Sequence, residues 1–224
     1  MNNEITLATQ ELPAHLQNTN KGIGRGNEEV GAHITIPRLK LLQKMSDEVD
    51  PHHPKYVESA KAGDYLNSLT GQNYGNAVYG LSVTFKNQWQ VWRSREAGGG
   101  YGGTYSSIAA ATEHVQTQEK PADWDINETH THLLLLKDPE TGQTDSTPVI
   151  MDFASSKLRV SRDWNSQITM KGGDRFAGLW KLSSVTATSK TGNSWMNVAT
   201  EFVGWAQEED YKAAETLYES HIGS

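Results

Sequence analysis

Hydrophobic and polar residues alternate along residues 78–95, the clearest strand pattern in the chain. The mainly apolar parity comprises Val83, Phe85, Trp89 and Val91, and the other comprises Thr84, Lys86, Gln88, Gln90 and Trp92. Because side chains of a strand alternate between its two faces, the first set is expected to be buried and the second to form an open face. Trp92 then lies exposed beside Lys86 and Gln90, and a large exposed aromatic side chain is typical of a contact surface.

Shorter patterns predict the other elements. The apolar run 133–136 predicts a strand buried on both faces within residues 130–137, followed by a turn at 138–142 and a returning strand at 148–153. Residues 36–45 suit either a strand or one or two helical turns. This segment is expected either to anchor the N-terminal arm to the core or to place Arg38, Lys40 and Lys44 on a phosphate-facing edge. Further strands are expected at 63–71, 176–188 and 194–205, and helices at 107–114, 155–168 and 208–221. In the second helix Val160, Trp164 and Ile168 recur every four residues, which predicts one buried stripe.

This order of elements predicts a mainly β fold with three parts. The core, residues 33–206, is expected to be an OB-like Greek-key barrel or a bent antiparallel sheet with an inserted helix. Residues 1–32 are polar without a sustained apolar period, which predicts a flexible N-terminal arm. Residues 207–224 are predicted to form an acidic, amphipathic C-terminal helix that packs onto the core.

The composition indicates in which kind of compartment the protein is expected to act. The 224 residues include no cysteine, which excludes disulfides and thiolate metal sites and fits a reducing compartment. No stretch approaches the roughly 20 apolar residues that span a membrane. Residues 1–10 are polar, whereas a secretory signal begins with a basic stretch followed by an apolar one. We therefore expect a soluble, cytoplasmic protein without membrane contact.

Charge is unevenly distributed in this acidic chain, whose net charge is −7. Residues 151–200 carry seven basic and three acidic side chains, whereas the last 24 residues carry one basic and six acidic side chains. Because salt screens charges over about 8–10 Å, a local basic groove can bind a polyanion despite the overall negative charge. The alternative is a solvated surface on which basic residues cluster by chance.

Aromatic residues next to basic ones suggest nucleic-acid binding, because rings stack on bases while cations contact phosphates. The candidate stacking residues are Trp92, Tyr101 and Tyr105, with Trp195 as a further candidate. Tyr101 and Tyr105 belong to a glycine-rich segment, 98–105, that is expected to be a flexible loop. The candidate phosphate contacts are Lys86, Arg93, Arg95, Lys157, Arg159, Arg162, Lys171 and Arg175. Each stacked base contributes about 1–3 kcal/mol. Core packing is the alternative role for aromatic residues, and it is preferred for Trp89, Trp164, Trp180 and Trp205.

Catalytic and metal-binding patterns are weaker. Glu128, His130 and His132 alternate along one predicted strand and could share a face, as ligands of a zinc ion do. Histidines two residues apart are common in strands without a metal, however, and no fourth ligand is evident. The chain has no G-x-S-x-G motif, and its glycine segment lacks the Lys-Ser/Thr of a phosphate-binding loop. We expect no enzyme activity, no cofactor and no metal.

Several sequence blocks resemble small proteins from the replication region of tailed phages. These blocks are residues 12–16 (LPAHL), 36–43 (IPRLKLLQ), 63–71 (GDYLNSLTG), the pair Trp92-Arg93 and the glycine segment 98–103. The resemblance implies a phage single-stranded DNA-binding protein with an OB-type fold, acting in the host cytoplasm. Such binders end in a disordered acidic tail closing on an aromatic residue, whereas this chain ends in Ile222-Gly223-Ser224.

Together these observations predict a protein of low sequence specificity that binds single-stranded DNA and supports phage replication or recombination. Replication or recombination proteins, or further copies of the chain, are possible partners. The alternative is a phage protein–protein interaction module, either a host-takeover or a virion-associated factor, that binds no nucleic acid.

Overall fold

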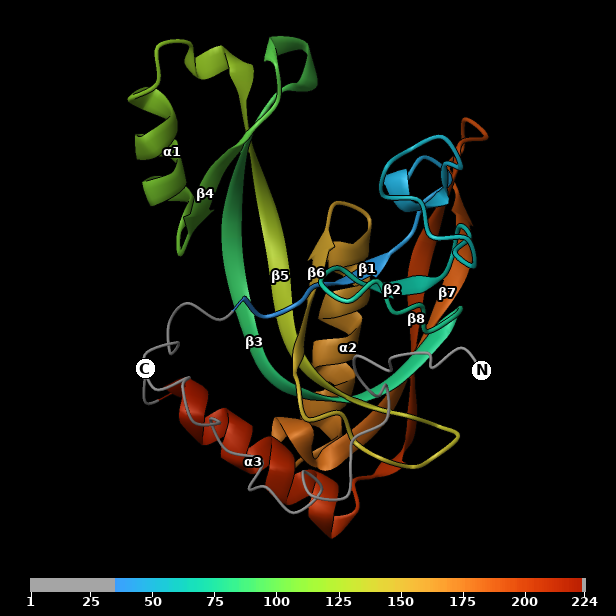
Figure 1. Cartoon of the computed structure of the whole chain (residues 1–224). Helices are drawn as coiled ribbons and strands as arrows, with labels where there is room; N and C mark the ends of the chain where they lie inside the picture. Colours follow the sequence, from blue (N-terminus) through green and yellow to red (C-terminus); the bar gives the residue numbers. More distant parts are fainter. Residues whose placement is uncertain (1–34, 223–224) are drawn as a thin grey trace, which may run out of the picture. The chain divides into compact units, whose positions relative to one another are not determined.

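Long strands and three helices make up most of residues 35–222, which the computed structural model describes (Figure 1). The strands are β1 (Leu39–Leu41), β2 (Tyr65–Asn67), β3 (Ala77–Arg93), β4 (Tyr101–Tyr105), β5 (Trp124–Lys137), β6 (Val149–Ala154), β7 (Gly178–Thr188) and β8 (Ser194–Trp205). The α-helices are α1 (Ile108–Gln116), α2 (Lys157–Lys171) and α3 (Glu208–Ile222), and the 3-10 turns are η3 (Asp47–Val49), η4 (Arg95–Ala97), η5 (Pro121–Asp123) and η6 (Arg175–Ala177). The N-terminal arm expected at residues 1–32 lies outside the described residues.

Antiparallel pairing joins six strands into one sheet in the order β6-β5-β3-β7-β8, with β4 paired to the far end of β3. The sheet is bent, most visibly along β3 (Figure 1). A barrel closes only when its edge strands pair, but here β6 is bridged to the segment before β1, where the Ile150 amide donates to the Pro37 carbonyl at 2.8 Å. The bent antiparallel sheet is therefore confirmed, and no closed barrel forms in the described chain.

A β-bulge in β3 changes which side chains share a face. The register with β5 shifts between Ser82 and Thr84, so that Val83 is the extra residue. Val83 packs with Leu81 on one face, whereas Phe85 contacts the rings of His130 and His132 on the other. The expectation that Val83 and Phe85 share a buried face is wrong, because an inserted residue reverses the alternation beyond it.

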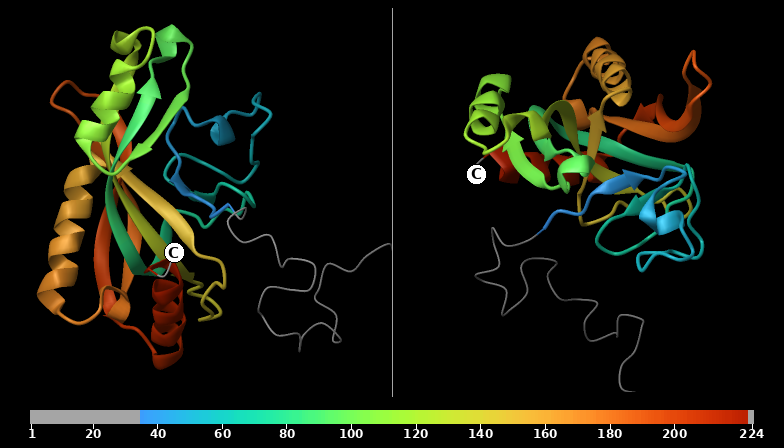
Figure 2. Two further views of the ribbon diagram at one scale, coloured as in Figure 1. Left: turned by 90° about the vertical axis from the view of Figure 1, so that its left-hand side faces the viewer. Right: turned by 90° about the horizontal axis from the view of Figure 1, so that it is seen from above.

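Helices cover both faces of the sheet, and α1 and α2 lie on the same one (Figure 2). Trp164 and Ile168 of α2 are buried with Leu134 and Leu136 of β5. On the other face Ala214 of α3 packs with a second cluster. That cluster contains Leu133 and Leu135, which confirms that the apolar run of β5 is buried on both sides.

The helix ends agree with the sequence only in part. Ser107 caps α1, since its Oγ accepts from the Ala110 amide at 3.2 Å. The predicted helix at 155–168 begins at Lys157, and Ser156, its N-cap residue, makes no side-chain capping hydrogen bond. No helix in the described part of the chain is long and apolar enough to cross a membrane.

A small second sheet lies beside the main one. β1 pairs antiparallel with β2, which settles residues 39–41 as a strand. Just after β1, the side-chain amide of Gln43 donates to the Met196 carbonyl at 3.0 Å and accepts from the Met196 amide at 2.9 Å. These two hydrogen bonds use backbone groups on the free edge of β8, and an edge covered in this way is less able to pair with another strand.

Three of the four tryptophans expected in the core are wholly or partly buried. Trp164 is 0% and Trp180 1% exposed, and their ring centroids are 6.0 Å apart. Trp89 is partly buried in the cluster beneath α1. The prediction is wrong for Trp205, which is 60% exposed at the end of edge strand β8. It stands opposite Gly178, which offers no side chain to cover it.

Candidate nucleic-acid interface

Within residues 35–222, no helix covers one face of the far half of the sheet. Helix α3 packs on this face only around Leu81 and Leu133, whereas α1 and α2 pack on the opposite face. Cross-strand register places polar side chains of three strands side by side here, and we refer to this surface as the open face. It consists of Lys86, Gln88, Gln90, Trp92, Tyr101, Thr104, Asp125, Asn127 and Thr131, and Thr129, which shares their side of β5, is buried.

An exposed aromatic pair lies at the outer end of the open face. Trp92 is 43% and Tyr101 55% exposed, with ring centroids 4.9 Å apart at an interplanar angle of 50°. The indole Nε1 of Trp92 donates to Gln90 Oε1 at 3.3 Å, which holds the ring along the strand. The predicted exposure of Trp92 is confirmed, and the structure brings Tyr101 to it.

The flexible loop expected at residues 98–105 is wrong for residues 101–105, because Tyr101–Tyr105 forms strand β4 on the edge of β3. Gly102 lies against the ring of Trp124, where a Cβ would stand 2.6 Å from Cζ3. A glycine is therefore required at this position for β4 to approach the sheet. The register shift between Val91 and Trp92 then places Tyr101 beside Trp92.

Tyr105, the third candidate for stacking, faces the other way. Its ring lies 5.2 Å from that of His114 in α1, and its hydroxyl donates to the Gly102 carbonyl at 2.9 Å. It packs in the cluster of Val91 and Val115. Tyr105 therefore supports the strand from behind and does not belong to the open face.

The predicted basic residues do not gather in one channel. Of the eight, Lys86 alone is part of the open face. Arg93 Nη2 lies 3.7 Å from Asp123 Oδ2, and Arg95 is exposed in η4 beyond the end of β3. The other five lie on α2 and in η6, and a helix turns successive side chains to different sides.

The basic residues of α2 and η6 have different surroundings. Arg159 Nε lies 3.8 Å from Asp163 Oδ2, Arg162 Nη2 donates to Glu128 Oε2 at 3.0 Å, and Lys171 Nζ lies 3.7 Å from the Phe202 ring centroid. Arg175 is half-buried, and this burial lowers its pKa to about 10. Lys157 lines a separate pocket with Arg38 and Lys40, two residues of the 36–45 segment.

Glu128, His130 and His132 share one face of β5, as their alternation predicted, but they belong to a hydrogen-bonded network. Arg175 Nη2 can only donate, so His132 Nδ1, at 3.2 Å, accepts. His132 Nε2 then donates to Ser161 Oγ at 2.7 Å, and Ser161 donates to His130 Nδ1 at 2.9 Å. His130 Nε2 lies 3.4 Å from Glu128 Oε1.

This network keeps His132 neutral. Its ring is wholly buried and stacks on Trp164 at 4.6 Å. Burial, together with the nearby charge of Arg175, lowers the pKa of His132 well below its ordinary value. Because both ring nitrogens are occupied by protein partners, neither is directed toward a metal ion. In the described part of the chain, no group of histidine and acidic side chains has the arrangement of a metal site.

The residues of β5 on the open face were not predicted from the sequence. Asn127 stands opposite Gln90, and Asp125 opposite Trp92. The alternation of polar residues at 125, 127, 129 and 131 is the signal that could have indicated them. Their neighbours depend on the strand register, which the sequence pattern alone does not specify.

These features define a mainly β protein with a bent antiparallel sheet, one face of which carries polar side chains and an exposed aromatic pair that no described helix covers. The family model of Pam3 phage gp34-like proteins matches residues 6–224, so the chain belongs to this bacteriophage protein family. No curated protein and no solved structure matches the chain.

Proposed function

We propose that this phage protein binds single-stranded DNA on the open face with little sequence preference. The observation that supports the proposal is the exposed Trp92–Tyr101 pair at the end of a row of amide and hydroxyl side chains. Base stacking tolerates any sequence, because every base has a π-face. Gln88, Gln90 and Asn127 offer donors and acceptors to bases or sugars. Binding of this kind would serve phage replication or recombination.

The test is fluorescence anisotropy of a labelled oligonucleotide titrated with the full chain at low salt. Trp92→Ala and Tyr101→Ala should each weaken binding by about 1–3 kcal/mol, which corresponds to a 5- to 150-fold rise in Kd. Trp205→Ala is the matched control, because it removes another exposed indole from β8. Circular dichroism checks that each variant is folded. No binding by the wild type at low salt sinks the proposal, and equal Kd values for wild type and both variants reject this site.

A protein partner is the second candidate for the same surface. The observation that favours it is the charge of the open face, where Lys86 is the single basic residue and Asp125 adds a negative charge. A tryptophan–tyrosine pair among polar residues is also typical of a protein–protein hot spot. Recovery of one stoichiometric phage or host protein after nuclease treatment, lost on Trp92→Ala, would support a host-takeover or virion-associated role.

A further inference from the structure

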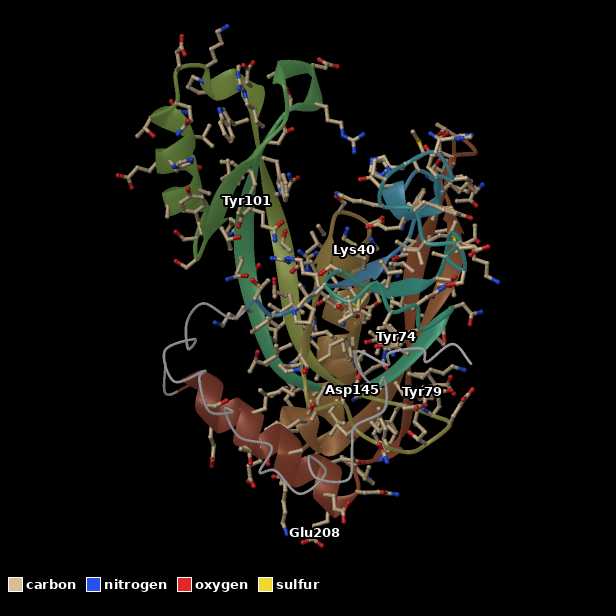
Figure 3. The ribbon with its side chains drawn as sticks, viewed as in Figure 1. Lys40, Tyr74, Tyr79, Tyr101, Asp145 and Glu208 are labelled. Atoms are coloured by element: carbon tan, nitrogen blue, oxygen red, sulfur yellow. The ribbon has the colours of Figure 1, made fainter. Side chains whose placement is uncertain are left out.

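A pocket of about 300 Å³ lies where β1, β6 and the first turn of α2 meet. Three basic side chains line it, Arg38 and Lys40 from the β1 segment and Lys157 from α2. Ser46 contributes a hydroxyl group. Figure 3 labels Lys40, the middle residue of β1. The fold thus brings Lys157 to the same pocket as Arg38 and Lys40, which are far from it in the sequence.

Lys157 differs from the other two cations in its charge environment. Arg38 is paired with Asp152, and Lys40 Nζ lies 2.7 Å from Glu48 Oε1. No carboxylate within the described residues forms an ion pair with Lys157. Burial lowers the pKa of this ammonium group. A partly buried cation without a partner is costly, so an anion entering the pocket gains a favourable contact.

The end of α2 adds to this preference for an anion. Lys157 is the first residue of the helix, and Ser156 leaves the first turn without a side-chain cap. The helix dipole favours negative charge at such an end. Glu48 and Asp152 also line the pocket, so Lys157 and the helix dipole give the pocket its preference for an anion.

The pocket also borders the open face. Lys86 stands opposite Thr131, Thr131 stands opposite Asp152, and Asp152 lines the pocket with Arg38. At about 4.8 Å per strand, the pocket edge lies roughly 10–15 Å from Lys86 across the sheet. A strand of DNA that lies along the open face can therefore reach it.

We propose that this pocket binds a phosphate group through Lys157, with Arg38 and Lys40 beside it. The phosphate has two possible sources, the backbone of DNA bound on the open face or a free phosphate. The first source rests on the proposed function, whereas the second does not. Arg38 supplies a planar fork of donors, and the lysines supply compact positive charges.

The pocket is tested first without DNA. Inorganic phosphate is titrated into the ¹⁵N-labelled full chain, with sodium chloride at matched ionic strength as the reference. We expect saturable shifts of the Ser46, Lys157 and Leu158 amides, with a Kd at least fivefold weaker in Lys157→Gln. Lys190→Gln removes the same charge from the exposed β7–β8 turn and should match the wild type. If Lys157→Gln does not fold, Lys40→Gln replaces it, because the Lys40 side chain is 44% exposed.

The same variants are then tested with the labelled oligonucleotide, which distinguishes the two sources. A three- to tenfold loss of DNA affinity in Lys157→Gln supports a backbone phosphate. Unchanged DNA affinity, with phosphate binding lost, supports a free phosphate. Absence of DNA binding contradicts the proposed function and leaves the phosphate result standing. The pocket proposal is overturned if phosphate causes no saturable shift in the wild type, or binds equally well to the pocket variant.

Discussion

Gly102 shows how one residue positions the aromatic pair. It allows β4 to approach Trp124 and Val91 closely, since a Cβ there would lie 2.6 Å and 2.9 Å from their side chains. Tyr101 is its neighbour and depends on the same backbone position to meet Trp92. A methyl group at this glycine must therefore move either β4 or the Trp124 ring.

We expect Gly102→Ala to lower the free energy of unfolding by about 1–3 kcal/mol, the usual cost of overpacking. It should also weaken DNA binding, because the shift separates Tyr101 from Trp92. Chemical denaturation and anisotropy measure the two effects. Gly204→Ala is the matched control, since nothing lies within 4 Å of its Cβ position and its φ is not positive. Equal stability of the two variants would contradict this account of Gly102.

At the scale of elements, buried polar groups join α2 to β5. Ser161 of α2 lies between His130 and His132 of β5, and Arg175 holds the far nitrogen of His132. Partnered in this way, the polar groups fix how the helix lies on the sheet, because leaving any of them unsatisfied would be costly. The network depends on neutral histidines, so it is sensitive to acid.

Stability should therefore fall as the pH drops below about 6.5, the ordinary pKa of histidine. The folded-state pKa of His132 is lowered, so between that pKa and 6.5 the unfolded chain binds more protons than the folded one. Stability from this group is complete above 6.5 and is lost on acidification, by up to about 1.4 kcal/mol per pH unit for each proton. Urea denaturation from pH 7.5 to pH 5 measures this slope.

The comparison variant is His132→Gln, which removes the titrating ring from the network. It should be less stable at pH 7.5 but should show a shallower loss on acidification than the wild type. His52→Gln, in the exposed turn at residues 51–54, is the matched control. Identical pH slopes for His132→Gln and the wild type would mean that His132 does not link folding to protonation.

At the scale of the molecule, periodic patterns predicted the elements better than their arrangement. The alternation in β3, the apolar run of β5 and the stripe on α2 all correspond to real elements. The bulge at Val83 and the pairing of β4 were missed, because each depends on contacts between distant segments. The exposure of Trp92 was predictable, because it follows from the local alternation of the strand. The scatter of the basic residues was not, because it depends on how distant elements are arranged.

That scatter leads to a prediction about salt. For single strands, log K falls against log salt with a slope of about −0.7 for each phosphate neutralised. The eight basic residues predicted from the sequence would give a slope of about −5 to −6. The structure leaves Lys86 on the open face and Arg38, Lys40 and Lys157 at its border. Contacts from these four give a slope of about −3.

Anisotropy titrations at several sodium chloride concentrations measure this slope directly. A value near −3 agrees with DNA lying on the open face and reaching the pocket, and Lys86→Gln should then make it less negative by about 0.7. Arg159→Gln is the matched control, because this exposed residue lies on α2, which covers the opposite face. A slope near −6 that Arg159→Gln reduces would place the DNA along α2 instead, since only that path engages the basic residues of the helix.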